Sequence, residues 1–513
     1  MATELDEGWS RMTETPTTTP VSATMLATAN PATGEPVGRW AVDDAAAVAA
    51  AVERARGAAR TWRELGFTER KRALQRWAAH LVVHSDEFCA LISAENGKPV
   101  DDAYLELITA VEHLNWAAVN ARKVLAPKKV WPGLMMANHE AVVEQRPYGV
   151  VGVIGPWNYP VYTPNGSIAY ALAAGNTVVF KPSELTTGIG HWYADAFAKA
   201  NPSLPQGILS VVSGPGETGR ALVESGVDMI AFTGSTATGK RIMAAAAARL
   251  TPVVLECGGK DAAIVAEDAD VAAAADAIAW SAMSNSGQTC VGTERCYVVA
   301  SVYDKFLSEL TQRVSELRPG TGSDASYGPM TLPSQVDVIS KHVADALAKG
   351  GRALVGGPES IEAPFVAPIV LVDVPEDSTA VTEETFGPTL TVRAVADVEE
   401  AIALANASEF GLASSVFSRK RGMEIARKLR AGATSVNSPA AYAAIPALPF
   451  GGVGESGIGR IHGAAGLLGF TRPHSIARQR FVIPGMALLS FARTESTLST
   501  VRKLTARRFG RAK

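Results

Sequence analysis

The chain has 513 residues, of which 47% are hydrophobic and 19% charged, and its formal net charge at pH 7 is −3. This composition is too apolar for an intrinsically disordered chain, and the near-neutral charge excludes the basic face of a non-specific nucleic-acid binder. Four cysteines (Cys89, Cys257, Cys290 and Cys296) are too few for a disulfide framework at this length. We therefore expect a globular, enzyme-sized cytoplasmic protein with reduced thiols and no nucleic-acid partner.

Residues 1–24 are predicted to be a disordered leader. They carry several acidic residues and a Thr/Pro tract from Thr13 to Pro20. A secretory signal needs a basic segment followed by an apolar one, and this stretch has neither. The region from Ala45 to about Lys123 follows, and its content of Ala, Arg, Glu and Leu favours helices. A stretch bounded by Pro127 and Pro147 is interpreted as a protruding hairpin.

From about residue 148 the sequence alternates short apolar runs with helical stretches. The predicted strands are Gly149–Ile154, Thr177–Phe180, Ile208–Val212, Asp228–Phe232 and Pro252–Glu256, and the predicted helices between them include Pro164–Ala174 and Thr186–Ala200. Continuously apolar strands separated by helices are typical of a parallel sheet covered on both faces, which binds ligands at the carboxyl ends of its strands. A second α/β block is expected from about Lys260 to Pro446, beginning with a helix over Val271–Met283.

Two glycine-rich turns are similar to nucleotide-binding motifs but depart from them. Gly214-Pro-Gly216-Glu-Thr-Gly219 fits G-x-G-x-x-G, yet no acid lies about 20 residues later to hold a ribose. Gly234-Ser-Thr-Ala-Thr-Gly239-Lys240 lacks the Ser or Thr of a Walker A loop, because residue 241 is Arg. Such turns still offer free N–H groups and a positive helix end to a phosphate. We interpret both as cofactor loops and exclude an NTPase.

No metal site or serine-hydrolase site is expected. His80 and His84 are one helical turn apart, but the sequence HLVVH lacks the Glu of a metalloprotease motif. The G-x-S-x-G elbow of serine hydrolases does not occur in the sequence.

Four segments together carry candidate chemistry. They are Pro156-Trp-Asn-Tyr-Pro160, Leu255-Glu256-Cys-Gly-Gly-Lys260, Ser286-Gly-Gln-Thr-Cys290 and Glu383-Glu384-Thr-Phe386-Gly-Pro388. In this order, with Cys290 placed 34 residues after Glu256, they resemble the motifs of the aldehyde dehydrogenase superfamily over roughly residues 25–475. Lys181-Pro-Ser-Glu184, Phe232-Thr-Gly-Ser235 and Pro449-Phe-Gly-Gly-Val-Gly-Glu-Ser-Gly457 fit the same family. The run from Leu250 to Lys260 and the sequence LPFGGVGESGIG are most similar to the branch that acts on fatty and aromatic aldehydes.

The resemblance implies NAD(P)-dependent oxidation of an aldehyde to the carboxylate through a thiohemiacetal and a thioester. Cys290 would be the nucleophile, and Asn158 would donate its side-chain amide to the oxyanion. Glu256 would activate the water that hydrolyses the thioester. The alternative for this carboxylate is a structural ion pair with Lys260.

By the same resemblance, ten residues would contact the cofactor. They are Ile154, Trp157, Lys181, Glu184, Gly214, Pro215, Gly234, Ser235, Glu384 and Phe386. A carboxylate at Glu184 can accept hydrogen bonds from both hydroxyls of the adenosine ribose and repels a 2′-phosphate, which favours NAD. Lys181 could still tolerate the 2′-phosphate, so use of NADP remains an alternative. A surface acid and a core Phe are the simpler interpretations of Glu384 and Phe386.

Two positions depart from the family pattern. Cys257 stands where the family usually has Leu, and Cys296 places a second thiol six residues after Cys290. Neither change removes a required group, although oxidation between Cys290 and a neighbouring thiol is conceivable.

Several alternatives to an apolar aldehyde substrate remain at this point. A succinate-semialdehyde-type dehydrogenase would need a cation for the distal carboxylate, and Arg295 or Arg122 could supply it. A CoA-acylating enzyme is disfavoured because Glu256, the hydrolytic base, is present. A cysteine ester or thioester hydrolase would not need the nucleotide loops, and a non-catalytic binding protein would not need an intact set of Cys290, Glu256 and Asn158.

The fold implied by the resemblance is α/β, with a Rossmann-type cofactor domain, an α/β catalytic domain and a small oligomerisation element. The cofactor domain is expected over residues 25–126 and 148–259, and the catalytic domain over residues 260–446. Residues 127–147 and 447–480 would bridge the subunits of a homodimer or homotetramer.

Residues 481–513 form an apolar and basic tail. The apolar run Phe481–Ala492 has 12 residues, fewer than the ~20 that a membrane-spanning helix needs. Residues 493–513 contain seven Lys or Arg and one Glu, a net charge of +6. The tail is interpreted either as a solvated or subunit-packed segment or as a contact with an anionic membrane surface.

Overall fold

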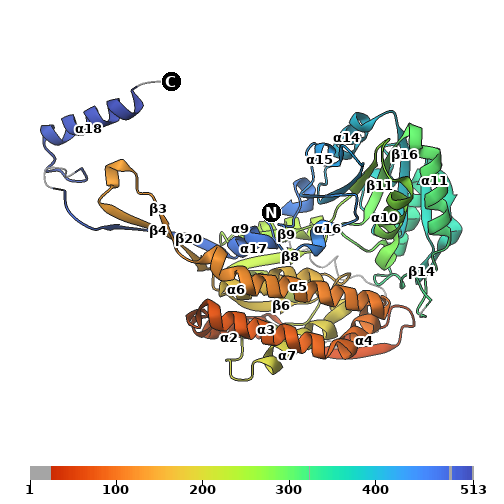
Figure 1. Cartoon of the computed structure of the whole chain (residues 1–513). Coiled ribbons are helices and arrows are strands. Elements are labelled where there is room, and N and C mark those ends of the chain that lie inside the picture. Colours follow the sequence, from red (N-terminus) through yellow and green to blue (C-terminus); the bar gives the residue numbers. More distant parts are fainter. Residues whose placement is uncertain (1–24, 323, 484–487, 511–513) are drawn as a thin grey trace. The chain divides into compact units, whose positions relative to one another are not determined.

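The computed structural model describes residues 25–322, 324–483 and 488–510 (Figure 1). The predicted leader, residues 1–24, lies outside these residues. The chain forms two compact units, one comprising residues up to 124 together with 147–470, the other comprising residues 125–146 and 471–513. All candidate site residues lie in the larger unit.

The larger unit contains a six-stranded sheet that includes all five strands predicted between residues 149 and 256. In spatial order its strands are β19 (Gly457–Ile458), β9 (Val253–Glu256), β8 (Met229–Thr233), β5 (Val150–Ile154), β6 (Thr177–Lys181) and β7 (Leu209–Val211). Strands β5 to β9 run parallel, and only β19 is antiparallel to its neighbour. The chain extends the sheet from β5 first towards β7 and then towards β9. Such a reversal of strand order marks the ligand-binding edge of a doubly wound sheet.

Consecutive residues of β5 and β6 point to opposite faces of the sheet, and nearly all of them are buried. Both faces of the sheet are therefore covered, and helices provide the cover. The helices around it are α2 (Ala45–Glu64), α3 (Gly66–Val83), α4 (Ser85–Asn96), α5 (Val100–Leu125), α6 (Tyr162–Ala174), α7 (Thr187–Ala200), α8 (Gly216–Glu224), α9 (Thr236–Ala247) and α17 (Gly463–Gly469). Asp44 caps α2 by accepting a hydrogen bond from the N–H of Ala47 at 2.8 Å. The apolar stripe of α2, including Val48 and Val52, packs in one core with Val150 of β5.

A second sheet of seven strands supports the remaining part of the larger unit (Figure 1). In spatial order its strands are β12 (Arg352–Val355), β15 (Ile369–Val372), β16 (Thr389–Val395), β11 (Thr293–Val299), β10 (Asp261–Val265), β17 (Ala413–Phe417) and β18 (Ala433–Val436). The helices of this part are α10 (Val271–Met283), α11 (Ala300–Ser315), α12 (Gln335–Ala348), α13 (Thr379–Thr382), α14 (Val398–Asn406), α15 (Gly422–Ala426) and α16 (Ala441–Ala444). Two short pairs, β1 (Met25–Ala29) with β2 (Pro36–Ala41) and β13 (Ile361–Glu362) with β14 (Phe365–Val366), complete the unit. The helix predicted over Val271–Met283 has the observed bounds of α10.

The smaller unit contains a three-stranded sheet and one helix. The sheet has the order β20 (Thr471–Gln479), β4 (His139–Pro147) and β3 (Lys128–Val130), and β3 with β4 forms the predicted hairpin. The helix is α18 (Glu495–Phe509), capped by the Thr494 hydroxyl, which accepts from the N–H of Thr497 at 3.2 Å. Residues 447–470 belong to the larger unit, and the bridging role predicted for them stays a prediction. Among the described helices, none combines the length and the apolar character needed to cross a membrane.

Candidate active site

The parallel strands bring Asn158, Glu256 and most of the predicted cofactor residues to one edge of the six-stranded sheet. Ile154, at the end of β5, lies opposite Lys181 on β6, and Thr233 on β8 lies opposite Glu256 on β9. The loops that follow β5 and β8 carry Trp157 and Asn158 on one side and Gly234 and Ser235 on the other. The carboxyl ends of these four strands therefore place two predicted catalytic residues, Asn158 and Glu256, beside predicted cofactor residues.

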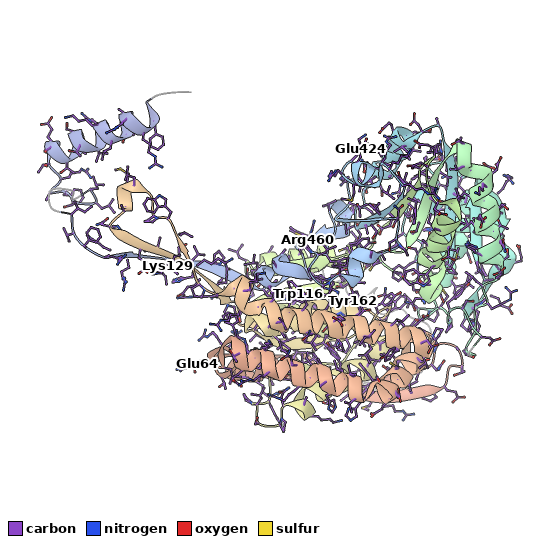
Figure 2. The ribbon with its side chains drawn as sticks, viewed as in Figure 1. Glu64, Trp116, Lys129, Tyr162, Glu424 and Arg460 are labelled. Carbon is purple, nitrogen blue, oxygen red and sulfur yellow. The ribbon has the colours of Figure 1, made fainter. Side chains whose placement is uncertain are left out.

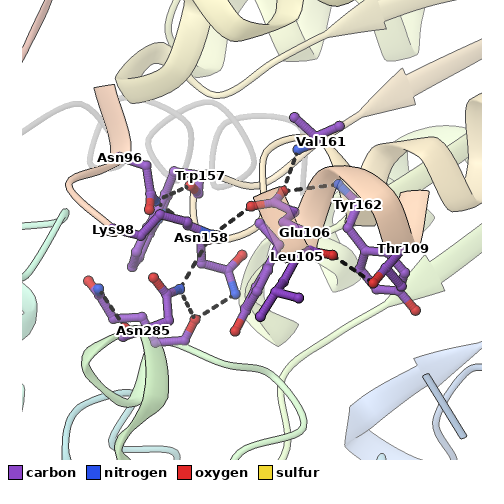
Figure 3. Close-up of polar contacts among 12 residues, drawn as sticks. Asn96, Lys98, Leu105, Glu106, Thr109, Trp157, Asn158, Val161, Tyr162 and Asn285 are labelled. Atoms are coloured by element: carbon purple, nitrogen blue, oxygen red, sulfur yellow. Dashed lines mark hydrogen bonds and ion pairs between the residues drawn. The ribbon is translucent and has the colours of Figure 1, made fainter. Parts of the chain in front are cut away.

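A buried ion pair holds the loop that carries Asn158 (Figure 3). The Lys98 ammonium lies 2.6 Å from a carboxylate oxygen of Glu106, and both side chains are nearly inaccessible, at 1% and 0% exposed. Lys98 also donates to the carbonyl of Asn158 at 3.0 Å. The second Glu106 oxygen accepts from the backbone N–H groups of Val161 and Tyr162 at 2.8 and 3.0 Å. The two charges thus fix the loop at its middle and at its end.

The turn before Cys290 is fixed by a different means. Asn285 and Ser286 adopt positive φ values of 52° and 59°, a conformation that favours glycine and asparagine. Gly287 also has a positive φ, and a Cβ there would lie 2.0 Å from the carbonyl oxygen of Gly387, so no side chain fits. The Asn285 amide donates to the carbonyls of Asn158 and Gln288 at 3.1 and 3.3 Å. This amide ties the turn to the loop after β5.

The Asn158 side chain lies against the same turn. Its amide nitrogen donates one hydrogen bond, to the carbonyl of Gln288 at 2.8 Å. An amide has two N–H donors, so the second can serve an oxyanion formed near Cys290.

Cys290 and Glu256 face each other across the site. The Cys290 thiol lies 3.9 Å from one carboxylate oxygen of Glu256, and the other oxygen of Glu256 has no hydrogen-bond partner among the described residues. Burial raises the pKa of the Glu256 carboxyl to about 8. Burial and the neighbouring carboxylates of Glu256 and Glu384 raise the pKa of the Cys290 thiol well above its usual range. Both shifts favour the protonated forms at neutral pH, and the ionised form of Glu256 is the base that faces the thiol.

The predicted alternative for Glu256, an ion pair with Lys260, does not form. The Lys260 ammonium instead pairs with Glu294 of β11, and both side chains are buried. The Glu294 carboxylate also accepts from the backbone N–H groups of Thr385 and Phe386. Lys260 and Glu294 together hold the segment that carries Glu384 and Phe386.

Glu384 and Phe386 extend the site on the side of the nucleotide loops. Glu384 accepts from the N–H of Gly259 at 3.0 Å, and burial together with Glu294 raises the pKa of its carboxyl to about 8. The Phe386 ring meets the Trp157 ring edge to face, with centroids 5.6 Å apart. Glu384 is partly buried and accepts a backbone hydrogen bond, which does not fit the simpler interpretation of a surface acid.

The nucleotide loops have the form expected for phosphate and ribose binding. Ser235 caps α9, directly after β8, and its hydroxyl accepts from the N–H of Thr238 at 3.4 Å. In the loop after β7, Pro215 is the residue that precedes the first turn of α8, and Gly214 has a positive φ of 154°. Lys181, at the end of β6, lies 3.5 Å from the carboxylate of the partly exposed Glu184. This donor set fits a dinucleotide, with helix ends for the pyrophosphate and a carboxylate for ribose hydroxyls.

A model of the aldehyde dehydrogenase family matches residues 18–476. The chain belongs to this family. Among its relatives, the 4,4′-diapolycopene aldehyde oxidase of Methylomonas sp is 37% identical over 465 residues, which cover 90% of this chain and 87% of that protein. A Mycobacterium tuberculosis protein provisionally named as an NADP⁺-dependent succinate-semialdehyde dehydrogenase is 36% identical to this chain. The aligned part covers 87% of this chain and 87% of that protein. A crystal structure of an aldehyde dehydrogenase from Mycobacterium tuberculosis complexed with NAD⁺ superposes with a TM-score of 0.84 at 35% identity, covering 91% of this chain and 97% of that one.

These similarities confirm the predicted α/β fold and the predicted activity, the NAD(P)-dependent oxidation of an aldehyde. The hydrolase and binding-protein alternatives are not supported by them. The comparisons leave the substrate and the role of each site residue open.

The aldehyde dehydrogenase site opens into a cavity of about 190 Å³ that reaches Cys290 and Glu256. Its lining is mainly apolar: Leu105, Tyr159, Tyr162, Trp280, Val291, Phe450 and Ile461 contribute, together with three alanines of residues 440–444. Tyr162, labelled in Figure 2, stands at the start of α6. Arg295 and Arg122, proposed above for a distal carboxylate, do not line this cavity. Arg295 is buried and donates to the carbonyls of Lys260 and Leu404, and Arg122 is exposed on α5.

The other cysteines and the histidine pair do not add to the aldehyde dehydrogenase site. Cys257 and Cys296 are free and buried, and Cys257 faces Gly239 of α9. His80 on α3 and His84, which follows the end of α3, stack on each other with ring centroids 4.1 Å apart. The described residues contain no group of three His, Cys, Asp or Glu side chains placed to hold a metal ion.

Sequence analysis did not identify Lys98, Glu106 and Glu294, which position the loops of the aldehyde dehydrogenase site. Glu106 could have been found from the sequence, because it lies on the face of α5 that also carries the buried Ala103, Leu107 and Ala110. A charge on an apolar helix face needs a buried partner. Glu294 likewise lies in β11, in which every residue is buried.

Proposed function

We propose that the protein oxidises apolar aldehydes, aliphatic or aromatic, to carboxylates, with Cys290 as nucleophile, Glu256 as general base and Asn158 as oxyanion donor. The observation that carries this proposal is the pair Cys290 and Glu256, in contact at 3.9 Å within a mainly apolar cavity. NAD(P) accepts the hydride when it is bound. Water supplies the second oxygen of the carboxylate.

The chain's own groups account for both halves of the reaction. The Cys290 sulfur adds to the aldehyde carbon while the thiol proton passes to Glu256, which the thiol faces. The developing oxyanion receives a hydrogen bond from the free N–H of the Asn158 amide. Once the carbon is at the thioester level and Glu256 has given its proton to solvent, Glu256 takes a proton from water. The oxygen of that water attacks the thioester, which releases the carboxylic acid and the Cys290 thiolate.

The cofactor would be held by the residues at the sheet edge. Ser235 and Gly234, at the start of α9, suit the pyrophosphate, and Glu184 with Lys181 suits the adenosine ribose. The partly exposed Glu184 carboxylate repels a 2′-phosphate, and Lys181 is already engaged with it, which supports a preference for NAD over NADP.

The lining of the cavity favours an apolar aldehyde over a semialdehyde with a distal carboxylate. The only Lys or Arg among the lining residues is Lys98, whose charge is already paired with Glu106. Asp102 also lines the cavity and repels an anionic substrate. The semialdehyde alternative is favoured only by the names of some relatives.

The decisive test is NADH or NADPH formation with octanal, benzaldehyde and succinic semialdehyde, comparing wild-type protein with Cys290→Ala. We expect octanal or benzaldehyde with NAD to give the highest kcat/KM and Cys290→Ala to abolish turnover. A higher kcat/KM for succinic semialdehyde would reject the apolar substrate class, and turnover that persists in Cys290→Ala would reject the mechanism.

We further propose that the cytoplasmic protein contacts anionic membranes through its C-terminal segment. Leu498, Leu504 and Phe509 are exposed on α18, which also carries four Lys or Arg between residues 502 and 508. Exposed apolar side chains among cations suit an anionic lipid surface. Part of the apolar run at 481–492, residues 484–487, lies outside the described residues.

Sedimentation with vesicles tests this contact. We expect the protein to sediment with vesicles containing phosphatidylserine and not with pure phosphatidylcholine. The combined variant Arg502→Glu, Lys503→Glu, Arg507→Glu and Arg508→Glu should lose this binding. Equal sedimentation of variant and wild type would reject the membrane contact.

We also propose a homodimer or homotetramer in which residues 127–147 and 447–480 bridge subunits. Val130, Trp131, Leu134 and Met135 are exposed in the hairpin region, and a cluster of exposed apolar residues is typical of an interface. Light scattering of the wild-type protein and of Trp131→Glu tests this, with a lower mass expected for the variant.

A further inference from the structure

One wall of the apolar cavity contains two buried histidines that the proposed mechanism does not use. His462 lines the cavity, and His113 of α5 lies behind it with ring centroids 4.0 Å apart. His462 is 1% exposed and His113 is fully buried. Three aromatic rings also lie against His462, those of Tyr162, Tyr170 and Phe450.

The His462 ring has unused hydrogen-bonding capacity. Both of its nitrogens are buried and have no hydrogen-bond partner among the described residues. On α16, the carbonyl of Ala443 already receives the Tyr162 hydroxyl at 2.6 Å and His113 Nε2 at 2.9 Å. Because a buried polar group without a partner is costly, a ring in this state at a cavity wall points to a ligand group that completes it.

His462 also has a backbone conformation that costs free energy. Its φ and ψ are 60° and 165°, a region that is essentially restricted to glycine. The residues on either side fix this conformation. Ile461 and Phe450 exchange two backbone hydrogen bonds, at 2.8 and 2.9 Å, and the His462 carbonyl accepts from the N–H of Gly466 at 2.7 Å. Gly166 of α6 leaves the space for the ring, since a Cβ there would lie 2.6 Å from His462 Nε2.

Both histidines are neutral at pH 7. Burial lowers the pKa of His462 well below its usual range and the pKa of His113 to about 4. A neutral imidazole offers one N–H donor and one acceptor, a combination that a hydroxyl group matches and an anion does not. A carboxylate in this cavity would also find its one lining cation, Lys98, already paired with Glu106.

We propose that His462 is a specificity-determining residue that hydrogen-bonds a hydroxyl group on the substrate, so that the preferred substrates are apolar aldehydes with a hydroxyl remote from the aldehyde carbon. This inference rests on the proposed function, because it assumes that the aldehyde carbon lies at Cys290 in the same cavity. It adds that the far part of the substrate is recognised by a neutral polar group within an otherwise apolar wall.

The test compares pairs of substrates that differ only in the hydroxyl. We would measure kcat/KM with NAD for unbranched alkanals and for ω-hydroxyalkanals of six to twelve carbons, and take the ratio for each chain length. For wild-type protein we expect a ratio of about ten or more at one chain length, because a site built to bind a hydroxyl discriminates against the analogue without it. In His462→Phe, which keeps a ring of similar size, the ratio should fall to about one through loss of activity on the hydroxyaldehyde.

Three comparisons keep the outcome decisive. His462→Gly suits the left-handed backbone and removes the ring, so it replaces His462→Phe if that variant does not fold, with the same expected ratio. His80→Phe makes the same change on the surface of α3 and should leave the ratio unchanged. A wild-type ratio near one at every chain length would overturn the inference, as would variants that lower activity on both substrates equally. If no alkanal is oxidised in a Cys290-dependent way, it is the proposed function that fails.

Discussion

Two loops meet at Cys290, and they are held by opposite means. The loop of residues 155–161 has ordinary backbone geometry and is fixed by a buried ion pair, Lys98 with Glu106. The turn of residues 284–290 is fixed by positive φ angles and by neutral amide hydrogen bonds. The first loop carries Asn158, the proposed oxyanion donor, and the second carries Cys290, the proposed nucleophile. A charged clamp depends on both partners being present, whereas a strained turn depends on many weaker contacts.

The largest effect is expected from a variant that breaks the buried ion pair between Lys98 and Glu106. Glu106→Ala would leave the Lys98 ammonium buried without its partner and release two backbone N–H groups. Loss of one partner of a buried ion pair typically costs about 3–5 kcal/mol of folding free energy. Urea unfolding followed by circular dichroism would measure this loss.

The double replacement supplies the control for the clamp. Lys98→Met with Glu106→Met removes both charges, so it should be less destabilising than Glu106→Ala alone. A loss below about 1 kcal/mol in Glu106→Ala would show that the loop does not depend on the ion pair.

A smaller effect is expected in the strained turn. Asn285→Ala removes two amide hydrogen bonds and places alanine at a positive φ, which together should cost about 1–3 kcal/mol. Asn285→Gly loses the same hydrogen bonds but suits the φ angle, so it should be the more stable of the two by about 1 kcal/mol. Thermal unfolding of both variants measures the difference, and equal stability would mean that backbone strain at Asn285 is negligible.

The smallest effect concerns Glu256, which faces the nucleophile between these two loops. Burial raises the pKa of its carboxyl to about 8. Since only the ionised carboxylate is a base, thioester hydrolysis should rise about fivefold from pH 7 to 8 and level off above about pH 9. Single-turnover decay of the acyl-enzyme formed from p-nitrophenyl acetate measures this step without a cofactor. The rise should be absent in Glu256→Gln, and a flat wild-type profile would contradict the role of Glu256.

The elements that local pattern determines were predicted closely. The five parallel strands and α10 follow from continuous apolar runs and helical periodicity, and each lies within two residues of its predicted bounds. Cys290 and Glu256, which only the family resemblance assigned to one site, lie 3.9 Å apart.

The groups that hold the site were harder to predict because their partners are distant in the chain. Glu294 acts on Thr385 and Phe386, about 90 residues away, and Asn285 acts on Asn158 across 127 residues. No local periodicity reports such contacts. His462 could not be singled out from the sequence either, because the proposal for it rests on two ring nitrogens that have no hydrogen-bond partner among the described residues.

The Lys98–Glu106 pair also constrains how this sequence can change over evolutionary time. Either residue replaced alone leaves a buried charge without its partner, whereas an exchange of both for apolar residues of similar volume can be tolerated. Single substitutions at either position should therefore be rare among functional descendants. We expect residues 98 and 106 to covary among relatives, changing together or remaining as they are.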